Sequence, residues 1–279
     1  MFKKLKSLKD LLWAVGIGLA LTALFIGLVA ASFTSYRGDR TRPVMDLNAG
    51  RAKKAESAEA SETPAPETGA LRADGTLHPL RRTDDAGEDY LAGLTILCDG
   101  SFSGLRGSGL SEITVWSSET GSLPMNEAED WKIRFPRDGS ITSPYSAVMI
   151  SKPKIVVLAV GNDASAAMDE SAFKEKYRSV IRGLCQNLPE LKIVCLGPCG
   201  VTASYAGDDG MTSEKAAEIG RWIQQICVDT GAYYGELGDS LWQDGCLKDA
   251  YADGSGRALN TEGLRALLGY LREHSVDGQ

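Results

Sequence analysis

The stretch Leu94–Leu105, LTILCDGSFSGL, joins a short apolar run to a turn. Leu94–Cys98 has the length of a buried strand, and the Asp, Gly and Ser residues that follow it favour a turn. Functional groups of α/β proteins gather at the carboxyl ends of strands, so this turn raises the question of a nucleophile. The tip of the turn offers Gly100 and Ser101, and only Ser101 carries a hydroxyl.

Similar apolar runs recur along the rest of the chain. Further strands are predicted at Ile113–Trp116, Ile155–Val160, Lys192–Leu196 and Tyr233–Glu236. Helices are predicted at Glu170–Asn187, Ser213–Val228 and Thr261–His274, with N-caps at Thr212 or Ser213 and at Asn260 or Thr261. Near-continuous apolar strands are typical of a parallel sheet covered on both faces. We therefore predict one α/β domain over residues 90–274, a three-layer doubly wound parallel sheet, followed by a short tail at 275–279.

In the irregular middle section, Trp131, Phe135 and Tyr145 have two interpretations. They form an aromatic rim over a site or, preferably, they pack at the edge of the domain.

Two segments without this alternation precede the domain. Residues 33–89 are rich in Ala, Glu, Thr and Pro and nearly free of aromatic residues, so they cannot bury enough apolar surface to fold alone. We predict a disordered stalk there. Residues 11–32 carry no charge, and as a helix this segment would span about 30 Å, the thickness of a bilayer core. A transmembrane signal-anchor is favoured over a cleavable signal peptide, whose apolar region is about 7–15 residues. Small residues at Val29 and Ala31 keep cleavage open.

The charged residues on either side of the apolar segment indicate on which side of the membrane the domain lies. Lysines of the short basic segment 1–10 precede the apolar segment and arginines follow it, which slightly favours an inside N-terminus. We expect a single-pass protein of the cell membrane with its C-terminal domain extracytoplasmic. The net charge of the chain is −7, and no basic cluster lies in the predicted domain, so a nucleic-acid partner is not expected.

The chain has six cysteines, at positions 98, 185, 195, 199, 227 and 246. An even number in an exported protein permits disulfides, and a Cys199–Cys246 bridge stays open. Most of the others lie in apolar strand-like or helix-like runs, where a free cysteine behaves as a small buried hydrophobe. CLGPC has no histidine near it, so we expect neither a metal site nor a cofactor.

Three segments, taken in order, resemble the SGNH or GDSL-like hydrolase family of exported bacterial enzymes. ILCDGSFSGL resembles the first block, where a strand ends in Gly-Asp-Ser and the serine is the nucleophile. VVLAVGND resembles the third block, whose Asn, here Asn162, helps form the oxyanion hole; equally, the Asn162 amide could serve only to tie the strand-end loop to the first turn. GCLKDAYADGSGRALNTEGLRALLGYLREH resembles the last block, where Asp-x-x-His completes a triad. Gly121 lies where the second block's glycine would contribute an amide to the same hole. The resemblance covers residues 90–274 and implies a flavodoxin-like fold and ester hydrolysis.

The chain departs from the family at the nucleophile. Aligned without gaps, Asp99 matches the Asp of Gly-Asp-Ser, Cys98 replaces the Gly, and Gly100 holds the position of the serine. Glycine has no nucleophile. Ser101 lies one residue further on and would serve only if the turn slipped by one residue.

The last block departs in the same way. Asp253 matches the triad Asp, but the histidine position falls on Gly256, or on Ala258 if two residues are inserted. Neither residue accepts a proton. The chain has two histidines; His78 belongs to the predicted stalk and His274 ends the last predicted helix, so neither is expected to act as the base.

Three functions stay in competition at this stage. The first is a membrane-anchored pseudoenzyme that keeps Gly121 and Asn162, with Asp99 and Asp163 in its cleft, and binds a cell-envelope glycan, an acylated ligand or a protein partner. The second is an active esterase or acyltransferase that uses Ser101 with Asp253, Asp99 or a water as an unorthodox base. The third is a structural module of a membrane complex.

Overall fold

The computed structural model describes residues 79–186 and 188–279 of the chain. Its main sheet has five strands: β1 Leu94–Cys98, β2 Thr114–Trp116, β5 Ile155–Ala159, β6 Lys192–Leu196 and β7 Tyr233–Gly235. All pair in parallel, in the order β2-β1-β5-β6-β7. The predicted parallel sheet is confirmed, with β1, β5 and β6 at its centre.

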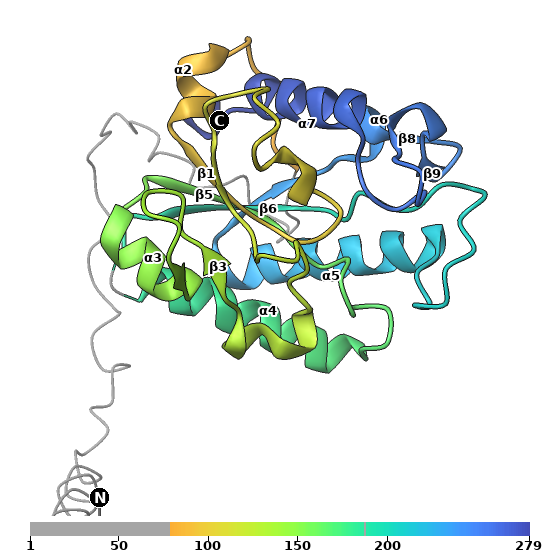
Figure 1. Ribbon diagram of the computed structural model, residues 1–279, viewed down its shortest axis with the longest axis horizontal. Helices are drawn as coiled ribbons and strands as arrows, with labels where there is room; N and C mark the ends of the chain where they lie inside the picture. Colours follow the sequence, from red (N-terminus) through yellow and green to blue (C-terminus); the bar gives the residue numbers. More distant parts are fainter. Residues whose placement is uncertain (1–78, 187) are drawn as a thin grey trace, which may run out of the picture. The chain divides into compact units, whose positions relative to one another are not determined.

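Helices cover both faces of this sheet (Figure 1). On one face lie α2 Gly87–Ala92 and α7 Thr261–Glu273, and on the other lie α3 Pro144–Ser151, α4 Glu170–Cys185 and α5 Ser213–Thr230. Successive strand residues point to opposite faces. Ile96 of β1 therefore joins the apolar core beneath α7, whereas Leu97 joins the core beneath α4 and α5. Two cores on one sheet make the three layers that the sequence predicts.

The two long C-terminal helices begin at the expected caps. The side chain of Thr212 accepts the Lys215 amide at the start of α5, and the side chain of Asn260 accepts the Gly263 amide at the start of α7. Each cap satisfies one of the amides that the first turn of a helix leaves without a carbonyl partner.

Short elements fill the connections. They are η1 Ser103–Leu105, η2 Met125–Asp130, β3 Ile133–Arg134, β4 Ile141–Thr142, α6 Gly238–Leu241, β8 Trp242–Gln243, β9 Cys246–Leu247, η3 Asp249–Tyr251 and η4 Val276–Gly278. Trp131 and Phe135 are buried in the core that also contains the α4 side chains. Of the two readings of these aromatic residues, packing against the domain is the correct one.

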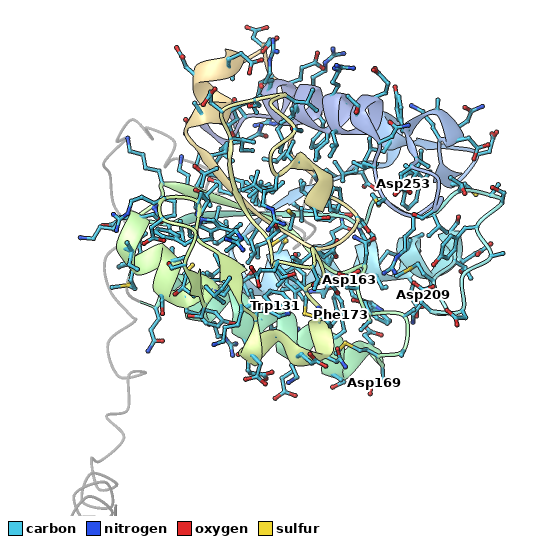
Figure 2. The ribbon with its side chains drawn as sticks, viewed as in Figure 1. Trp131, Asp163, Asp169, Phe173, Asp209 and Asp253 are labelled. Atoms are coloured by element: carbon cyan, nitrogen blue, oxygen red, sulfur yellow. The ribbon has the colours of Figure 1, made fainter. Side chains whose placement is uncertain are left out.

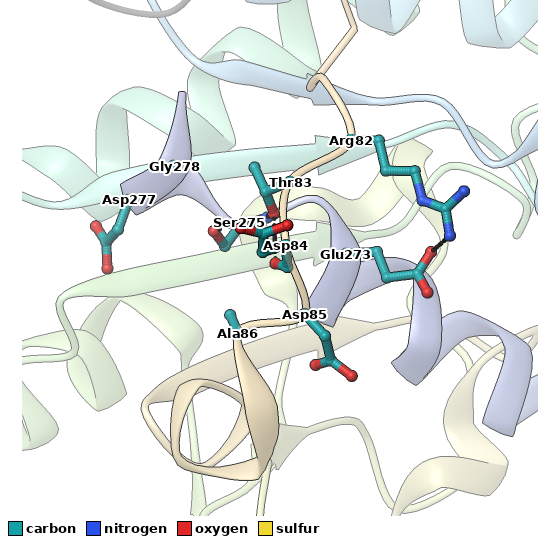
Figure 3. Close-up of a pocket in the computed structure, with 9 residues that line it drawn as sticks. All are labelled: Arg82, Thr83, Asp84, Asp85, Ala86, Glu273, Ser275, Asp277 and Gly278. Atoms are coloured by element: carbon teal, nitrogen blue, oxygen red, sulfur yellow. Dashed lines mark hydrogen bonds and ion pairs between the residues drawn. The ribbon is translucent and has the colours of Figure 1, made fainter.

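The folded domain begins earlier than residue 90. The amide of Leu80 donates to the Tyr234 carbonyl (2.8 Å), and the amide of Ala86 donates to the Arg272 carbonyl (3.0 Å). Figure 3 shows the pocket formed where this segment meets the end of the chain, and an ion pair of 2.8 Å joins Arg82 to Glu273 there. Residues 79–89 therefore belong to the domain and not to the stalk. Leu80 is buried in the core beneath α7, and backbone hydrogen bonds and ion pairs hold the rest of the segment; one apolar residue leaves no periodic pattern in the sequence.

The end of the chain is also part of the domain. Val276, in η4, is buried, and its amide donates to the Tyr90 hydroxyl (3.0 Å). The five residues predicted as a tail thus close against α2.

The remaining predictions concern thiols and membrane segments. All six cysteines are free thiols, so the Cys199–Cys246 bridge is absent; Cys98, Cys195, Cys199 and Cys227 are buried. Among the helices of residues 79–186 and 188–279, none combines the length and the hydropathy needed to cross a bilayer. The predicted span at residues 11–32 lies outside the described residues.

Candidate functional site

The site lies where the sheet reverses its strand order. From β1 the chain moves outward to β2, and from β5 it moves the opposite way to β6, so the loops after β1 and β5 separate at their carboxyl ends. Such a switch point is where doubly wound sheets bind ligands. Asp99–Ser101 follow β1 there, and Gly161–Asp163 follow β5.

Asp99 ties these two loops together. Its side chain is fully buried. Oδ2 accepts the amides of Gly161 (3.0 Å) and Asn162 (2.8 Å), and Oδ1 accepts the amide of Ser101 (3.1 Å). The Asn162 side chain adds longer contacts of 3.3 and 3.4 Å through Nδ2. Burying a neutral polar group without a hydrogen-bond partner costs about 2–7 kcal/mol, and burying an ionised carboxylate costs more. The Asp99 carboxyl group therefore needs these donors. Asp99 therefore organises the turn and the loop opposite.

The environment of Asp99 changes its proton affinity. Burial is the largest cause and raises the pKa of Asp99 to about 7, and the negative charge of Asp163 adds to the rise. The amides of Asn162 and Ser101 act in the opposite direction. Two carboxylates placed this close to each other favour a proton on one of them.

Asp163 accepts backbone amides from two further loops. Its Oδ2 accepts the amide of Gly100 (3.1 Å), the residue at the nucleophile position, and the amide of Leu123 (3.0 Å). A Cβ on Gly100 would lie 3.3–3.4 Å from the Asp163 carboxylate oxygens. The carboxylate thus fills the space beside position 100 and takes the amide of Gly100.

Arg257 balances the charge of Asp163. Its Nη2 donates to Asp163 Oδ1 (3.0 Å) and to the Asn162 carbonyl (3.1 Å), while Nη1 pairs with Asp209 Oδ2 at 3.0 Å. Figure 2 labels both aspartates, which come from the loops after β5 and β6. Only 9% of the Asp163 side chain and 25% of the Arg257 side chain are exposed. Arg257 belongs to the last family block and stands between Gly256 and Ala258, the two positions at which the sequence places the missing histidine.

Ser101 is buried next to Cys199. Only 2% of its surface is exposed, and its hydroxyl finds no hydrogen-bond partner among the described residues. Its neighbour is the thiol of Cys199, whose pKa burial raises to about 12, so that thiol does not ionise near neutral pH. Within residues 79–186 and 188–279, the Ser101 hydroxyl has no hydrogen bond to a base that would activate it.

The residues of the last block serve a turn. The Asp253 side chain is exposed and accepts the Ser255 amide (2.9 Å), while the Asp253 carbonyl accepts the Gly256 amide (3.0 Å). Gly256 has φ +74°, and a Cβ there would lie 2.6 Å from Thr202 Oγ1, so position 256 has no room for a histidine. Asp253 holds no imidazole in this arrangement.

His274 lies at the far end of α7. Its Nδ1 is 2.8 Å from the Tyr270 carbonyl, and its ring stacks on that of Tyr270 at 4.0 Å between centroids. A helix of 13 residues is about 18 Å long, so His274 is remote from the loops that precede α7. His78 lies outside the described residues.

The two residues predicted to form the oxyanion hole have other partners. The Gly121 amide donates to the Ser118 carbonyl (3.2 Å) in a turn that φ +86° at Gly121 closes. The Asn162 side chain faces Asp99, as described above. The second-block amide that reaches the site belongs to Leu123, two residues further along.

Sequence reasoning missed Leu123, Asp209 and Arg257. Arg257 could have been found: it lies in the last family block, Asp163 lies in the third, and the two blocks meet in the fold, so their opposite charges indicate an ion pair. No pattern in the sequence pointed to Leu123, because it acts through its backbone. Within the described residues no cluster of His, Cys, Asp or Glu side chains is arranged to hold a metal ion.

The comparisons with known proteins agree with the sequence blocks. The model of the GDSL-like lipase/acylhydrolase family matches residues 92–268. No curated protein matches the chain.

Several solved structures are similar to the chain. A candidate platelet activating factor from Streptococcus pneumonia is 15% identical, with 64% of this chain and 82% of that chain covered and a TM-score of 0.48. A candidate lipolytic protein of the G-D-S-L family from Desulfitobacterium hafniense DCB-2 is 15% identical (66% and 99% covered, TM-score 0.44). A GDSL-like lipase from Bacteroides thetaiotaomicron VPI-5482 is 10% identical (64% and 85% covered, TM-score 0.42).

Proposed function

The chain belongs to the GDSL-like lipase/acylhydrolase family, and on that premise we propose that its domain is a catalytically degenerate member that binds without hydrolysing. The domain is anchored in the cell membrane through residues 11–32 and stands outside the cytoplasm. Its partner is a cell-envelope glycan, an acylated ligand or another protein.

One observation carries this proposal: Asp163 accepts the Gly100 and Leu123 amides and pairs with Arg257. An acyl-transfer enzyme needs a hydroxyl beside a base and needs free donors for the oxyanion. Here position 100 has no side chain, and its amide already serves a carboxylate. The oxyanion of a tetrahedral intermediate placed here would meet the negative charge of Asp163 instead of free donors.

The rival esterase would need Ser101. Because that serine is buried, has no partner and shares its surroundings with a protonated thiol, the geometry gives it neither access nor a base. Two family features remain, the turn after β1 and the loop after β5. The hydrogen bonds that Asp99 accepts from both account for them without catalysis. A purely structural role has no specific contact in its favour.

Turnover of acetyl and short-chain acyl esters by the full-length protein tests the proposal. We expect no rate above that of buffer, and no difference between the wild type and Ser101→Ala. Gly100→Ser should also stay inactive, because the new side chain would press on Asp163 and would find no imidazole. Hydrolysis by the wild type that Ser101→Ala abolishes, with folding preserved, would establish the esterase instead.

A further inference from the structure

Three hydrogen-bond donors converge on one carboxylate at the switch point of the sheet. They are the amides of Gly100 and Leu123 and the guanidinium of Arg257, at 3.1, 3.0 and 3.0 Å from the Asp163 oxygens. The group they hold is nine-tenths buried. Two amides and a guanidinium around a buried oxygen pair make up the donor set that binds carboxylates in proteins.

We propose that this donor set is a carboxylate-binding site, and that Asp163 occupies it from within the chain. The proposal rests on the proposed function, since an active enzyme would use the Gly100 amide for its oxyanion. It adds a ligand class: a compound or side chain that ends in a carboxylate is what the site accepts when Asp163 is withdrawn.

The tethered carboxylate keeps small free anions out. Asp163 is part of the same loop as Asn162, whose amide Asp99 holds, so its carboxylate is always near the three donors at a high effective concentration. A free carboxylate that offers no further contacts cannot compete with it. The wild type should therefore ignore formate and acetate, and removal of the Asp163 carboxylate should reveal the site.

Chemical rescue provides the test. Asp163→Ala removes one carboxylate group, and formate is that group as a free anion. We expect Asp163→Ala to be less stable than the wild type and to gain about 3–5 °C in melting temperature at a tenfold excess of formate over its Kd. The melting temperature of the full-length protein is measured in formate and, separately, in pivalate at the same ionic strength. Pivalate is the control anion, because it is too large for the space that one carboxylate leaves.

Asp209→Ala is the matched control. It removes the other carboxylate that pairs with Arg257 but leaves the Gly100 and Leu123 amides occupied. Formate should not stabilise Asp209→Ala or the wild type more than pivalate does. Asp163→Ser also removes the carboxylate but leaves a hydroxyl near the two amides, so formate should raise its melting temperature by a smaller amount. It replaces Asp163→Ala if the alanine variant does not fold.

Two results would overturn the inference. One is equal stabilisation of the Asp163 and Asp209 variants by formate, and the other is no stabilisation of either Asp163 variant. Both would leave the proposed function standing, provided that the wild type stays inactive. Ester hydrolysis by the wild type would defeat the proposed function whatever formate does.

Discussion

Asp99 stabilises the turn after β1 by accepting hydrogen bonds from backbone amides. It accepts amides from both strand-end loops and is fully buried, so the turn persists without a serine at position 100. In an active relative of this architecture the same turn would present a nucleophile. Here the aspartate before that position accepts three backbone amides, so it has a role in folding that does not depend on catalysis.

The pKa of Asp99 makes a prediction about stability. Burial, then the charge of Asp163, raise this pKa to about 7 in the folded protein, while an unfolded aspartate titrates near 3.9. The folded state therefore binds the proton more tightly. The stability contributed by this group is fully present below about pH 4 and is lost as pH rises through about 7, by up to about 1.4 kcal/mol per pH unit.

Asp99→Asn removes that titration. We expect a flatter dependence of the unfolding free energy on pH between about 4 and 7 than in the wild type, whatever the loss of stability from the substitution itself. Urea unfolding at several pH values measures it, and Asp208→Asn, at an exposed position, is the control. Parallel pH profiles for Asp99→Asn and the wild type would show that Asp99 is ionised throughout.

At the scale of elements, the caps decide where the long helices begin. Thr212→Ala removes the acceptor of the Lys215 amide at the start of α5 and should cost about 1 kcal/mol of unfolding free energy. Thr212→Ser keeps the hydroxyl and should cost much less. Chemical denaturation of the two variants makes the comparison, and equal losses would mean that the threonine methyl, and not the cap, matters.

The sequence predicted the elements that carry a long apolar pattern. Strands β1 and β6 begin and end where expected, and α4, α5 and α7 differ by at most two residues at an end, because burial on two faces or on one stripe leaves a clear periodicity. Residues 79–86 were not predicted because they bury a single large apolar side chain, Leu80, and are otherwise held by backbone hydrogen bonds and ion pairs. The same reason hid the site: Gly100 and Leu123 act through amides, which any residue supplies.

The candidate site residues named from the sequence lie near one another, with partners that the sequence did not indicate. Asp99 and Asp163 were placed in the cleft from their positions after two strands, and the structure brings them together through neighbouring amides. Gly121 and Asn162 were assigned to an oxyanion hole by resemblance, but the structure gives their donors to Ser118 and Asp99. Resemblance transfers a position reliably and a hydrogen-bond partner much less so.

At the scale of the whole molecule, the predicted anchor and stalk would hold the domain at the membrane surface. If residues 11–32 are an uncleaved span, protein in membranes should keep its N-terminus and resist extraction by carbonate. Protease added from outside should cut between residues 36 and 78 and spare 79–89, because Leu80, Thr83 and Ala86 are held by backbone hydrogen bonds to the domain. N-terminal sequencing and mass spectrometry of the released fragment check both. A mature chain that begins near Ser32 would identify a signal peptide.

Covalent labelling tests the central claim most directly, because it requires only an activated serine and no knowledge of the substrate. The full-length protein is treated with a fluorophosphonate probe and its intact mass is measured, with a known serine hydrolase as the positive control. Because position 100 has no hydroxyl, Ser101 is buried, and Asp163 occupies the donors of the oxyanion, we predict that the mass does not change. A single stoichiometric adduct that maps to Ser101 and disappears in Ser101→Ala would contradict the account.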